Sequence, residues 1–239
     1  KEAEKKIRRN NALLQGIKEI FEAGLVCETD EELVAASLRV AERVTGSGSG
    51  FIGEIGPDGL LHDIVISDAG LQQCTVEEQT GYCRPSVNLM ITGIYGRVMA
   101  HGAPFFTNDP SSHPATTGTP EGHPPLTSFL GVPLAYRENI IGLIALANRD
   151  GGYSAEEVET VQALASAFVE TLFKSRTVRA LRESEARERS NALQLKQYLD
   201  STPIPVWIAH DPECRVITSN LAAARLLGVD PDLNVSQSS

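Results

Sequence analysis

Two short apolar runs near the middle of the chain, 129–136 (FLGVPLAY) and 140–147 (IIGLIALA), have the length of β-strands. The polar residues 137–139 lie between them, so this segment predicts a β-hairpin. A Gly-Gly break follows, and Ser154 then has Glu157 three residues further on. This is the spacing of a capping box, in which each residue satisfies a free backbone N–H at the start of a helix. The pattern therefore predicts a hairpin followed by a helix that begins at Ser154.

The N-terminal part of the chain predicts two helices. Residues 1–26 carry apolar side chains at helical spacing, namely Ile7, Leu14, Ile17, Phe21 and Leu25. Thr29 and Glu32 form a second capping-box pair, which opens a helix to about Val44. The glycine- and serine-rich run 46–50 ends that helix.

Between the N-terminal helices and the central hairpin, the pattern predicts a further hairpin and then weakens. Strands 51–55 and 60–66 surround the turn GPDG, in which proline and glycine favour the required backbone angles. A short helix at 91–100 and a short strand at 104–108 follow. The stretch 109–127 is rich in Pro, Ser, Thr, Gly and His, and loops of this length are usually functional.

The helix that begins at Ser154 is predicted to continue to about Leu199, far beyond the average of ~11–12 residues. Its first part, Ala155–Lys174, has apolar positions that should pack on the sheet. The later part, 176–200, keeps a 3/4 spacing of Leu181, Ala192, Leu195 and Leu199, with Glu185 and Glu188 on the same stripe. We interpret 176–200 as a parallel dimeric linker helix, with a single solvated connector helix as the alternative.

Composition excludes several classes of function. The chain has 239 residues, 41% of them hydrophobic, and a formal net charge of −10. This charge argues against nucleic-acid binding, which needs a basic face. The sequence predicts neither a membrane-spanning run nor direct membrane contact, and we expect a cytoplasmic protein. The four cysteines form no CxxC pair, which argues against a zinc knuckle and fits a reducing compartment.

The segments SFLGVPL (128–134), IIGLIALANR (140–149) and GGYSAEE (151–157) resemble the C-terminal half of a GAF domain, a small-molecule sensing module. The resemblance implies an α+β fold with a central antiparallel β-sheet, helices on one face and a ligand pocket on the other. It assigns residues 1–20 to an N-terminal linker helix and 21–175 to the GAF domain. The helices expected on the first face are 11–25, 31–44 and 155–174.

The C-terminal segment 201–239 resembles the beginning of a PAS domain. Its order is an apolar run at 206–208, a turn, a strand at 215–218, and then Asn220 with a short helix to Leu227. The combination of modules is similar to bacterial and archaeal multi-domain sensors of the histidine kinase or cyclase type, including two-component systems. In such proteins a linker helix feeds an output domain, which this sequence does not contain.

The resemblance also directs attention to cofactor-binding residues. Some GAF domains of this kind hold haem, whose iron takes His or Cys as an axial ligand. The candidates are Cys74, Cys83, His113 and His123. The alternative is that Cys74 is a small buried side chain and that both histidines lie on a loop surface.

Further residues are candidates for a pocket around a polar ligand. Asn148-Arg149, Tyr153 and the pair Glu156-Glu157 partly match the pattern of cyclic-nucleotide-binding GAF domains, although in many relatives such positions only brace the last strand against the last helix. Asn108 and Asp109 pair with Arg84 or Arg97 in a ligand-binding interpretation, whereas Asp before Pro is also a turn initiator. The complete set of pocket candidates is Tyr82, Arg84, Asn108, Asp109, Thr127 and Asn148.

The sequence thus predicts a sensory or regulatory module that binds a small molecule or cofactor and relays the change through a dimeric helix. No catalytic or metal-binding motif is recognised, and we expect no enzyme activity. One alternative is a ligand-free scaffold for dimerisation. Others are a redox sensor based on Cys74 and Cys83, or a methionine sulfoxide reductase of the GAF type, which uses nucleophilic cysteines.

Overall fold

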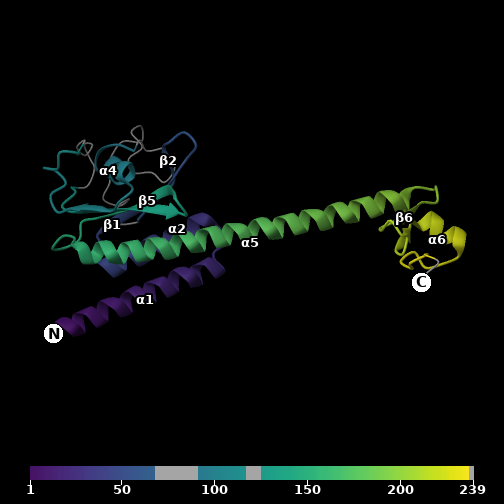
Figure 1. Ribbon diagram of the computed structural model, residues 1–239, viewed down its shortest axis with the longest axis horizontal. Helices are drawn as coiled ribbons and strands as arrows, with labels where there is room; N and C mark the ends of the chain where they lie inside the picture. The colour runs from purple at the N-terminus through teal and green to yellow at the C-terminus, as the bar shows by residue number, and fades with distance from the viewer. Residues whose placement is uncertain (68–90, 117–124, 237–239) are drawn as a thin grey trace. The chain divides into compact units, whose positions relative to one another are not determined.

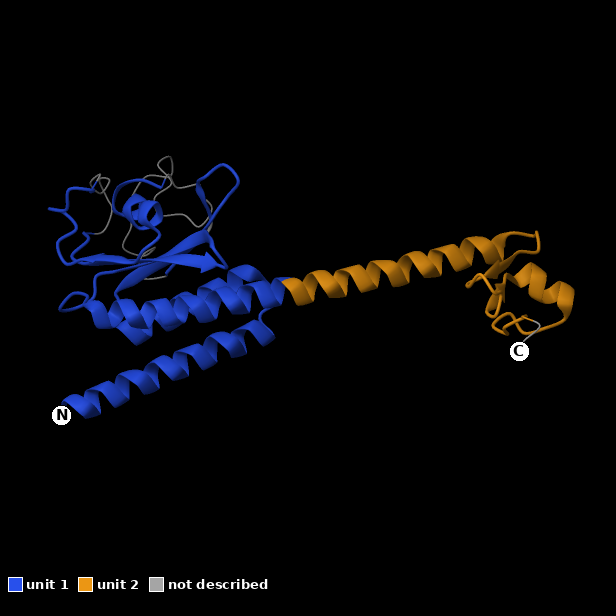
Figure 2. Ribbon diagram, viewed as in Figure 1, with its two compact units in different colours: residues 1–176 blue, residues 177–239 orange. Residues whose placement is uncertain are grey.

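The computed structural model describes residues 1–67, 91–116 and 125–236. The chain divides into two compact units, residues 1–176 and residues 177–239, which are coloured separately in Figure 2. Each unit is described by itself below. No helix among the described residues is both long and apolar enough to cross a membrane.

The first unit is built on a five-stranded sheet of order β2-β1-β5-β4-β3, in which every neighbouring pair is antiparallel. Its strands are β1 (Ser49–Ile55), β2 (Leu61–Ile66), β3 (Phe105–Thr107), β4 (Phe129–Tyr136) and β5 (Asn139–Ala147). Both predicted hairpins are present, and the α+β fold with an antiparallel sheet is confirmed.

The β4–β5 hairpin is tighter than the sequence predicts. Tyr136 pairs directly with Asn139, so the turn contains two residues and Asn139 already belongs to the strand. Arg137 has a φ of 56°. Two-residue hairpins use such left-handed backbone because it matches the right-handed twist of the strands.

Three helices lie on one side of the sheet (Figure 1): α1 (Glu2–Val26), α2 (Asp30–Thr45) and the first part of α5 (Ala155–Ser201). Their buried side chains meet those of the strands in one apolar core, whose members include Ile20, Leu38, Ile52, Leu130, Leu146, Leu164 and Phe168. The predicted three-helix layer is therefore present. The apolar stripe expected on α1 is largely not part of it, because Ile7, Leu14, Phe21 and Leu25 are exposed and only Ile17 packs on the core.

The helix ends follow the local sequence signals. Thr29 and Glu32 form the predicted capping box, and Gly46 ends α2 in a left-handed conformation. At the start of α5, the Glu157 carboxylate accepts from the Ser154 N–H at 2.9 Å as predicted. The Ser154 hydroxyl accepts from the N–H of Glu156 at 3.2 Å, one residue earlier than in the usual box.

The opposite face of the sheet carries α4 (Gly93–His101), which Figure 1 shows on the side away from α1, α2 and α5. A second apolar cluster lies there, formed by Leu61, Ile94, Val98, Phe129, Leu143 and Ala145. Among the described residues it is smaller than the first core, and many residues packed against it are only partly buried. Among the described residues, more apolar side chains are therefore buried on the face under α1, α2 and α5 than on the α4 face.

The second unit contains the later part of α5, a two-stranded antiparallel sheet of β6 (Trp207–Ala209) and β7 (Ile217–Ser219), and α6 (Leu221–Leu227). Asn220 holds these pieces together. Its Oδ1 accepts from the N–H of Val206 at 3.0 Å and its Nδ2 donates to the Leu199 carbonyl at 2.8 Å. The predicted strand and the short helix after Asn220 are found, although the strand begins at Ile217 and not at Arg215. The apolar run forms β6, and Asn220 caps α6.

Candidate functional site

Asn148, a pocket candidate, connects the end of β5 to the segment that precedes β4. Its φ of 58° is a left-handed conformation that Asn adopts more readily than most residues. Its Oδ1 accepts from the Thr127 N–H at 2.9 Å and from the Thr127 hydroxyl at 3.2 Å, and its Nδ2 donates to the Pro125 carbonyl at 3.0 Å. The structure therefore brings Thr127 and Asn148 together, and their side chains bind each other.

Arg149 ties the same turn to two helices. Its Nε donates to the carbonyl of Thr45 at 2.7 Å, at the end of α2. A second guanidinium nitrogen lies 3.2 Å from the Glu157 carboxylate, in the first turn of α5. Burial would raise the pKa of Glu157, but its hydrogen bonds from Ser154 and the charge of Arg149 outweigh burial and lower it. Arg149 thus braces the last strand against the helical layer.

Asn108, at the end of β3, makes a reciprocal pair of hydrogen bonds with the backbone of Tyr153. Its Nδ2 donates to the Tyr153 carbonyl at 3.0 Å and its Oδ1 accepts from the Tyr153 N–H at 2.7 Å. The Tyr153 hydroxyl lies 2.8 Å from that of Ser47. Burial raises the pKa of Tyr153 to about 12. The positions that partly match the cyclic-nucleotide pattern are therefore engaged in bonds within the chain.

Asp109 forms a turn. Its carboxylate accepts from the Ser111 hydroxyl at 2.8 Å and from the Ser112 N–H at 3.2 Å. Hydrogen bonds from Ser112 and then from Ser111 lower the pKa of Asp109. This is the turn-initiating arrangement expected of Asp before Pro110.

The α4 face carries a row of aromatic rings in mutual contact. Phe51 meets Tyr95 edge to face at 5.3 Å between ring centroids, and Tyr95 meets Phe129 at 5.6 Å. Phe105 continues the row, 6.2 Å from Phe129 and 4.9 Å from His113. These rings come from β1, α4, β4, β3 and the loop after β3, so the row joins four elements and one loop of the first unit.

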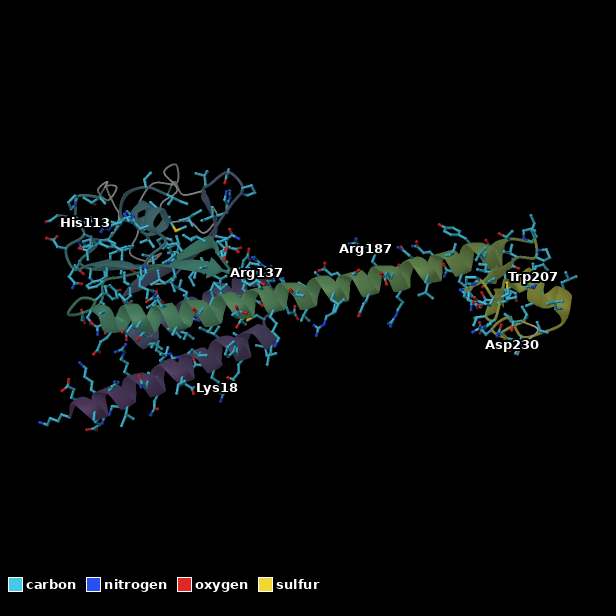
Figure 3. The ribbon with its side chains drawn as sticks, viewed as in Figure 1. Lys18, His113, Arg137, Arg187, Trp207 and Asp230 are labelled. Atoms are coloured by element: carbon cyan, nitrogen blue, oxygen red, sulfur yellow. The ribbon has the colours of Figure 1, made fainter. Side chains whose placement is uncertain are left out.

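Two cationic or titratable groups lie at the Phe105 end of this row. The Arg97 guanidinium is 4.7 Å from the centroid of the Phe105 ring, a cation–π contact, and Arg97 is itself exposed. His113, labelled in Figure 3, is half-buried, and its Nδ1 accepts from the Ala115 N–H at 3.1 Å. That bond leaves its Nε2 as the nitrogen for another partner.

The remaining cofactor and pocket candidates, Cys74, Tyr82, Cys83, Arg84 and His123, lie outside the described residues. Of the haem candidates, only His113 is described. Within the described ranges, no group of three or more His, Cys, Asp or Glu side chains gathers as a metal-binding cluster. Of the haem candidates, the described residues thus place one imidazole, that of His113, beside the ring of Phe105.

The aromatic row is the part of this face that the sequence analysis missed. Tyr95 and Phe105 lie in segments correctly predicted as helix and strand, but nothing in their spacing shows that they meet. The only sequence signal is the presence of several aromatic residues on short elements around the long polar stretch 109–127.

At the end of the first unit, Arg176 of α5 binds two other elements. Its guanidinium holds both carboxylate oxygens of Glu54 in β1, at 2.8 and 2.6 Å, and its Nε donates to Asp30 at 2.5 Å. Hydrogen bonding to Glu54, reinforced by Asp30, raises the pKa of Arg176 despite partial burial. One turn earlier, Phe173 stacks on Tyr136 of β4 at 3.7 Å. The place where α5 leaves the first unit is thereby fastened to the sheet and to α2.

Comparison with known proteins agrees with this architecture. A family model described as "GAF domain" matches residues 27–172, more than half of the chain. The GAF domain of a phosphoenolpyruvate-protein phosphotransferase from Coxiella burnetii superimposes with a TM-score of 0.56 at 18% identity, covering 70% of this chain and 96% of that one. The corresponding Acinetobacter domain gives a TM-score of 0.52 at 15% identity, covering 70% and 96%.

Free methionine-R-sulfoxide reductase from Neisseria meningitidis, solved with its substrate, has the same fold, with a TM-score of 0.54 at 14% identity and coverage of 70% and 91%. At such identities these likenesses show the fold alone. The family match runs from Cys27, just after α1, to Leu172 in α5, and it includes the β4–β5 hairpin and the Arg149–Glu157 ion pair. By its sequence and by its sheet and helices, the chain belongs to the GAF domain family.

Proposed function

We propose that this GAF module is a sensor that binds a small molecule on the α4 face of the sheet. The observation that carries the proposal is the difference between the two faces. The apolar side chains under α1, α2 and α5 form one large buried core. The described apolar cluster on the α4 face is smaller, and the aromatic side chains at its edge are only partly buried. Elements held by few buried contacts are those that open most readily to admit a ligand.

The groups at this edge favour a ligand with a flat apolar body and a negative charge. Phe105 and Tyr95 offer partly buried ring surface, and Arg97 supplies an exposed guanidinium. Guanidinium groups bind carboxylate and phosphate through paired hydrogen bonds. The braced residues Asn108 and Asn148 support this site by holding the segments that border it, and they need not contact the ligand.

A ligand at this site biases the module by its differential affinity for two arrangements of the α4 face. The relay we propose runs through the sheet to Arg176 and onward along α5, as a dimeric linker, to an output domain of a longer protein such as a sensor kinase or cyclase. Support for the first step is the Arg176–Glu54 pair, which joins α5 to β1.

The test is a thermal-shift screen of the purified chain against benzoate, salicylate, indole-3-acetate and the common nucleoside monophosphates. A compound present at 100 times its Kd stabilises the folded state by about 2.7 kcal/mol. For a unit of this size the melting temperature then rises by about 5–10 °C. Arg97→Gln should reduce that shift by more than half, whereas Arg182→Gln, on an exposed stretch of α5, should leave it unchanged. Absence of any shift across the panel, or an equal shift in Arg97→Gln, contradicts the proposal.

A further inference from the structure

The ring of Phe105 is in contact with two nitrogen-bearing side chains from different parts of the first unit. Arg97 belongs to α4, and its guanidinium carbon is 4.7 Å from the centroid of the Phe105 ring. His113 belongs to the loop after β3, and its imidazole centroid is 4.9 Å from the same point, with an angle of 58° between the two ring planes. The two groups therefore meet around one ring, close enough for a single small molecule to contact both.

The contact with Phe105 does not consume the hydrogen-bond donors of Arg97. A guanidinium is attracted to an aromatic ring by the ring's quadrupole, and this attraction uses none of its five N–H groups in a hydrogen bond. Within the described parts of the chain, no carboxylate or carbonyl accepts from these groups, and the Arg97 side chain is exposed. The ring thus holds the guanidinium while its donors stay available to a ligand.

The turn at 110–116 determines which nitrogen of His113 donates. The His113 N–H donates to the Pro110 carbonyl at 3.4 Å, and the Thr116 N–H donates to the His113 carbonyl at 2.9 Å. The imidazole Nδ1 accepts from the Ala115 N–H at 3.1 Å. A neutral imidazole carries one hydrogen, so this bond places it on Nε2, which has no acceptor among the described residues. The Nε2–H is therefore a donor on a half-buried side chain that its own turn holds in place.

The charge of this region suits a negatively charged ligand. The whole chain has a formal net charge of −10, but residues 91–116 contain one acidic residue, Asp109, and one basic residue, Arg97. The Asp109 carboxylate is occupied by the Ser111 hydroxyl at 2.8 Å and by the Ser112 N–H at 3.2 Å. An anion beside Arg97 and His113 is therefore not opposed by a free carboxylate of this segment.

We infer that His113 is the specificity-determining residue of the ligand site on the α4 face, and that it selects an aromatic ester of a tetrahedral oxyanion, phosphate or sulfate, over an aromatic carboxylate. The inference rests on the proposed function and deepens it by naming the class of ligand. A carboxylate has two oxygens, and the paired N–H groups of one guanidinium satisfy both. A phosphate or sulfate monoester has a third terminal oxygen, and the Nε2–H of His113 supplies the donor for it.

The first experiment measures the dissociation constants of four probes for the whole 239-residue chain by isothermal titration calorimetry, in a buffer free of phosphate and sulfate. The probes are phenyl phosphate, phenyl sulfate, benzoate and inorganic phosphate. Phenyl sulfate and benzoate carry the same charge on the same ring, so the comparison isolates the arrangement of the oxygens. Phenyl sulfate should bind about tenfold more tightly than benzoate, because its third oxygen gains a hydrogen bond from His113.

The other two probes identify the oxyanion and test the ring. Whichever of phenyl phosphate and phenyl sulfate binds more tightly identifies the oxyanion that the site prefers, and binding of either more tightly than benzoate supports the inference. Inorganic phosphate lacks the apolar body, so it should bind at least about tenfold more weakly than phenyl phosphate. Equal affinity for these two phosphates overturns the assignment of an aromatic ester.

The second experiment separates the donor of His113 from its part in the turn. In His113→Asn the amide oxygen can replace Nδ1 as the acceptor for the Ala115 N–H, but no atom reaches the position of Nε2. In His113→Gln the amide nitrogen reaches that position as a donor. His113→Asn should therefore abolish the preference for phenyl sulfate and change the benzoate constant by less than about twofold, whereas His113→Gln should keep part of the preference. Thermal unfolding checks that both variants are folded.

The failure of this inference is distinguishable from the failure of the proposed function. Equal binding of phenyl sulfate and benzoate, or an unchanged preference in His113→Asn, overturns the role of His113. If Arg97→Gln still weakens benzoate binding in that case, the ligand site on the α4 face stands. A preference that His113→Asn keeps and His113→Gln loses would show that His113 only holds its turn, and overturns the inference. No binding of any probe to the original chain overturns the inference together with the proposed site.

Discussion

Removal of the Arg176 side chain is the perturbation whose effect on the first unit follows most directly from the structure. The guanidinium makes three charged hydrogen bonds, two to Glu54 and one to Asp30. Arg176→Ala would leave those two carboxylates without their shared cation. Hydrogen bonds to charged groups contribute about 1.5–3 kcal/mol, and exposed ion pairs about 0–1 kcal/mol. Since the Arg176 side chain is 35% exposed, we expect a loss of about 1–2 kcal/mol in the free energy of unfolding.

Native-state hydrogen exchange of the β4 and β5 amides measures this loss, because it reports the opening of the first unit independently of the second. Arg176→Lys keeps the charge but cannot bind both oxygens of Glu54 in the same plane, so its loss should be intermediate. Combining Arg176→Ala with Glu54→Gln should cost about 1 kcal/mol less than the sum of the single changes. Additive effects, or an equal loss in the control Arg182→Ala, would refute the assignment of Arg176 as the fastening of α5 to β1.

Four further predictions concern three residues of the brace between β3, β5 and α5. Tyr153→Phe removes the hydroxyl contact with Ser47 and should destabilise the first unit by about 1 kcal/mol; a neutral effect on β5 exchange would contradict this. Because the folded pKa of Tyr153 is raised to about 12, Tyr153 contributes to the free energy of unfolding below its unfolded pKa of ~10, and this contribution is lost as pH rises from ~10 to about 12. Ultraviolet titration of tyrosinate, with Tyr153→Phe as the reference, measures this pKa. Asn108→Ala should cost about 1–2 kcal/mol through its two bonds to the Tyr153 backbone. Asn108→Asp should also destabilise, because its second carboxylate oxygen would face the Tyr153 carbonyl, another acceptor; a neutral effect of either change would be inconsistent with the geometry. Because the pKa of Glu157 is lowered in the folded state, Glu157 contributes stability above its unfolded pKa of ~4.3, and this contribution is lost as pH falls through its folded pKa. Glu157→Gln should therefore make the free energy of unfolding fall less steeply at acid pH. An unchanged pH dependence would count against the ion pair with Arg149.

Features that depend on neighbouring residues were predictable from the sequence. The Thr29–Glu32 capping box, the β4–β5 hairpin and the Asn220 cap of α6 each arise within a few residues of chain, and each is found. The family resemblance added the α+β fold with a central antiparallel sheet and helices on one face, which periodicity alone does not determine. The order of the strands in the sheet was not predicted.

The candidate site was predictable only in part, because a polar side chain at the end of a strand can bind either a ligand or the chain itself. Asn108, Thr127 and Asn148 were predicted as pocket residues, and their described bonds are to the backbone or to each other. The rings of Tyr95, Phe105 and Phe129 meet only in the folded sheet. The α1 stripe illustrates the same limit, since helical spacing identified Leu14 and Ile17 together but could not show that they lie on different faces.

The most direct test of the sensory proposal is hydrogen exchange of the whole chain with and without the panel compound that gives the largest thermal shift. We predict slower exchange in α4 and β3 and a change in the segment 177–200 of α5. In Thr177→Pro, where proline interrupts the helix just beyond the first unit, α4 should still be protected and the change in 177–200 should disappear. Protection confined to α4 in the original chain would contradict a relay through α5, and unaltered exchange in α4 and β3 would contradict ligand binding on this face.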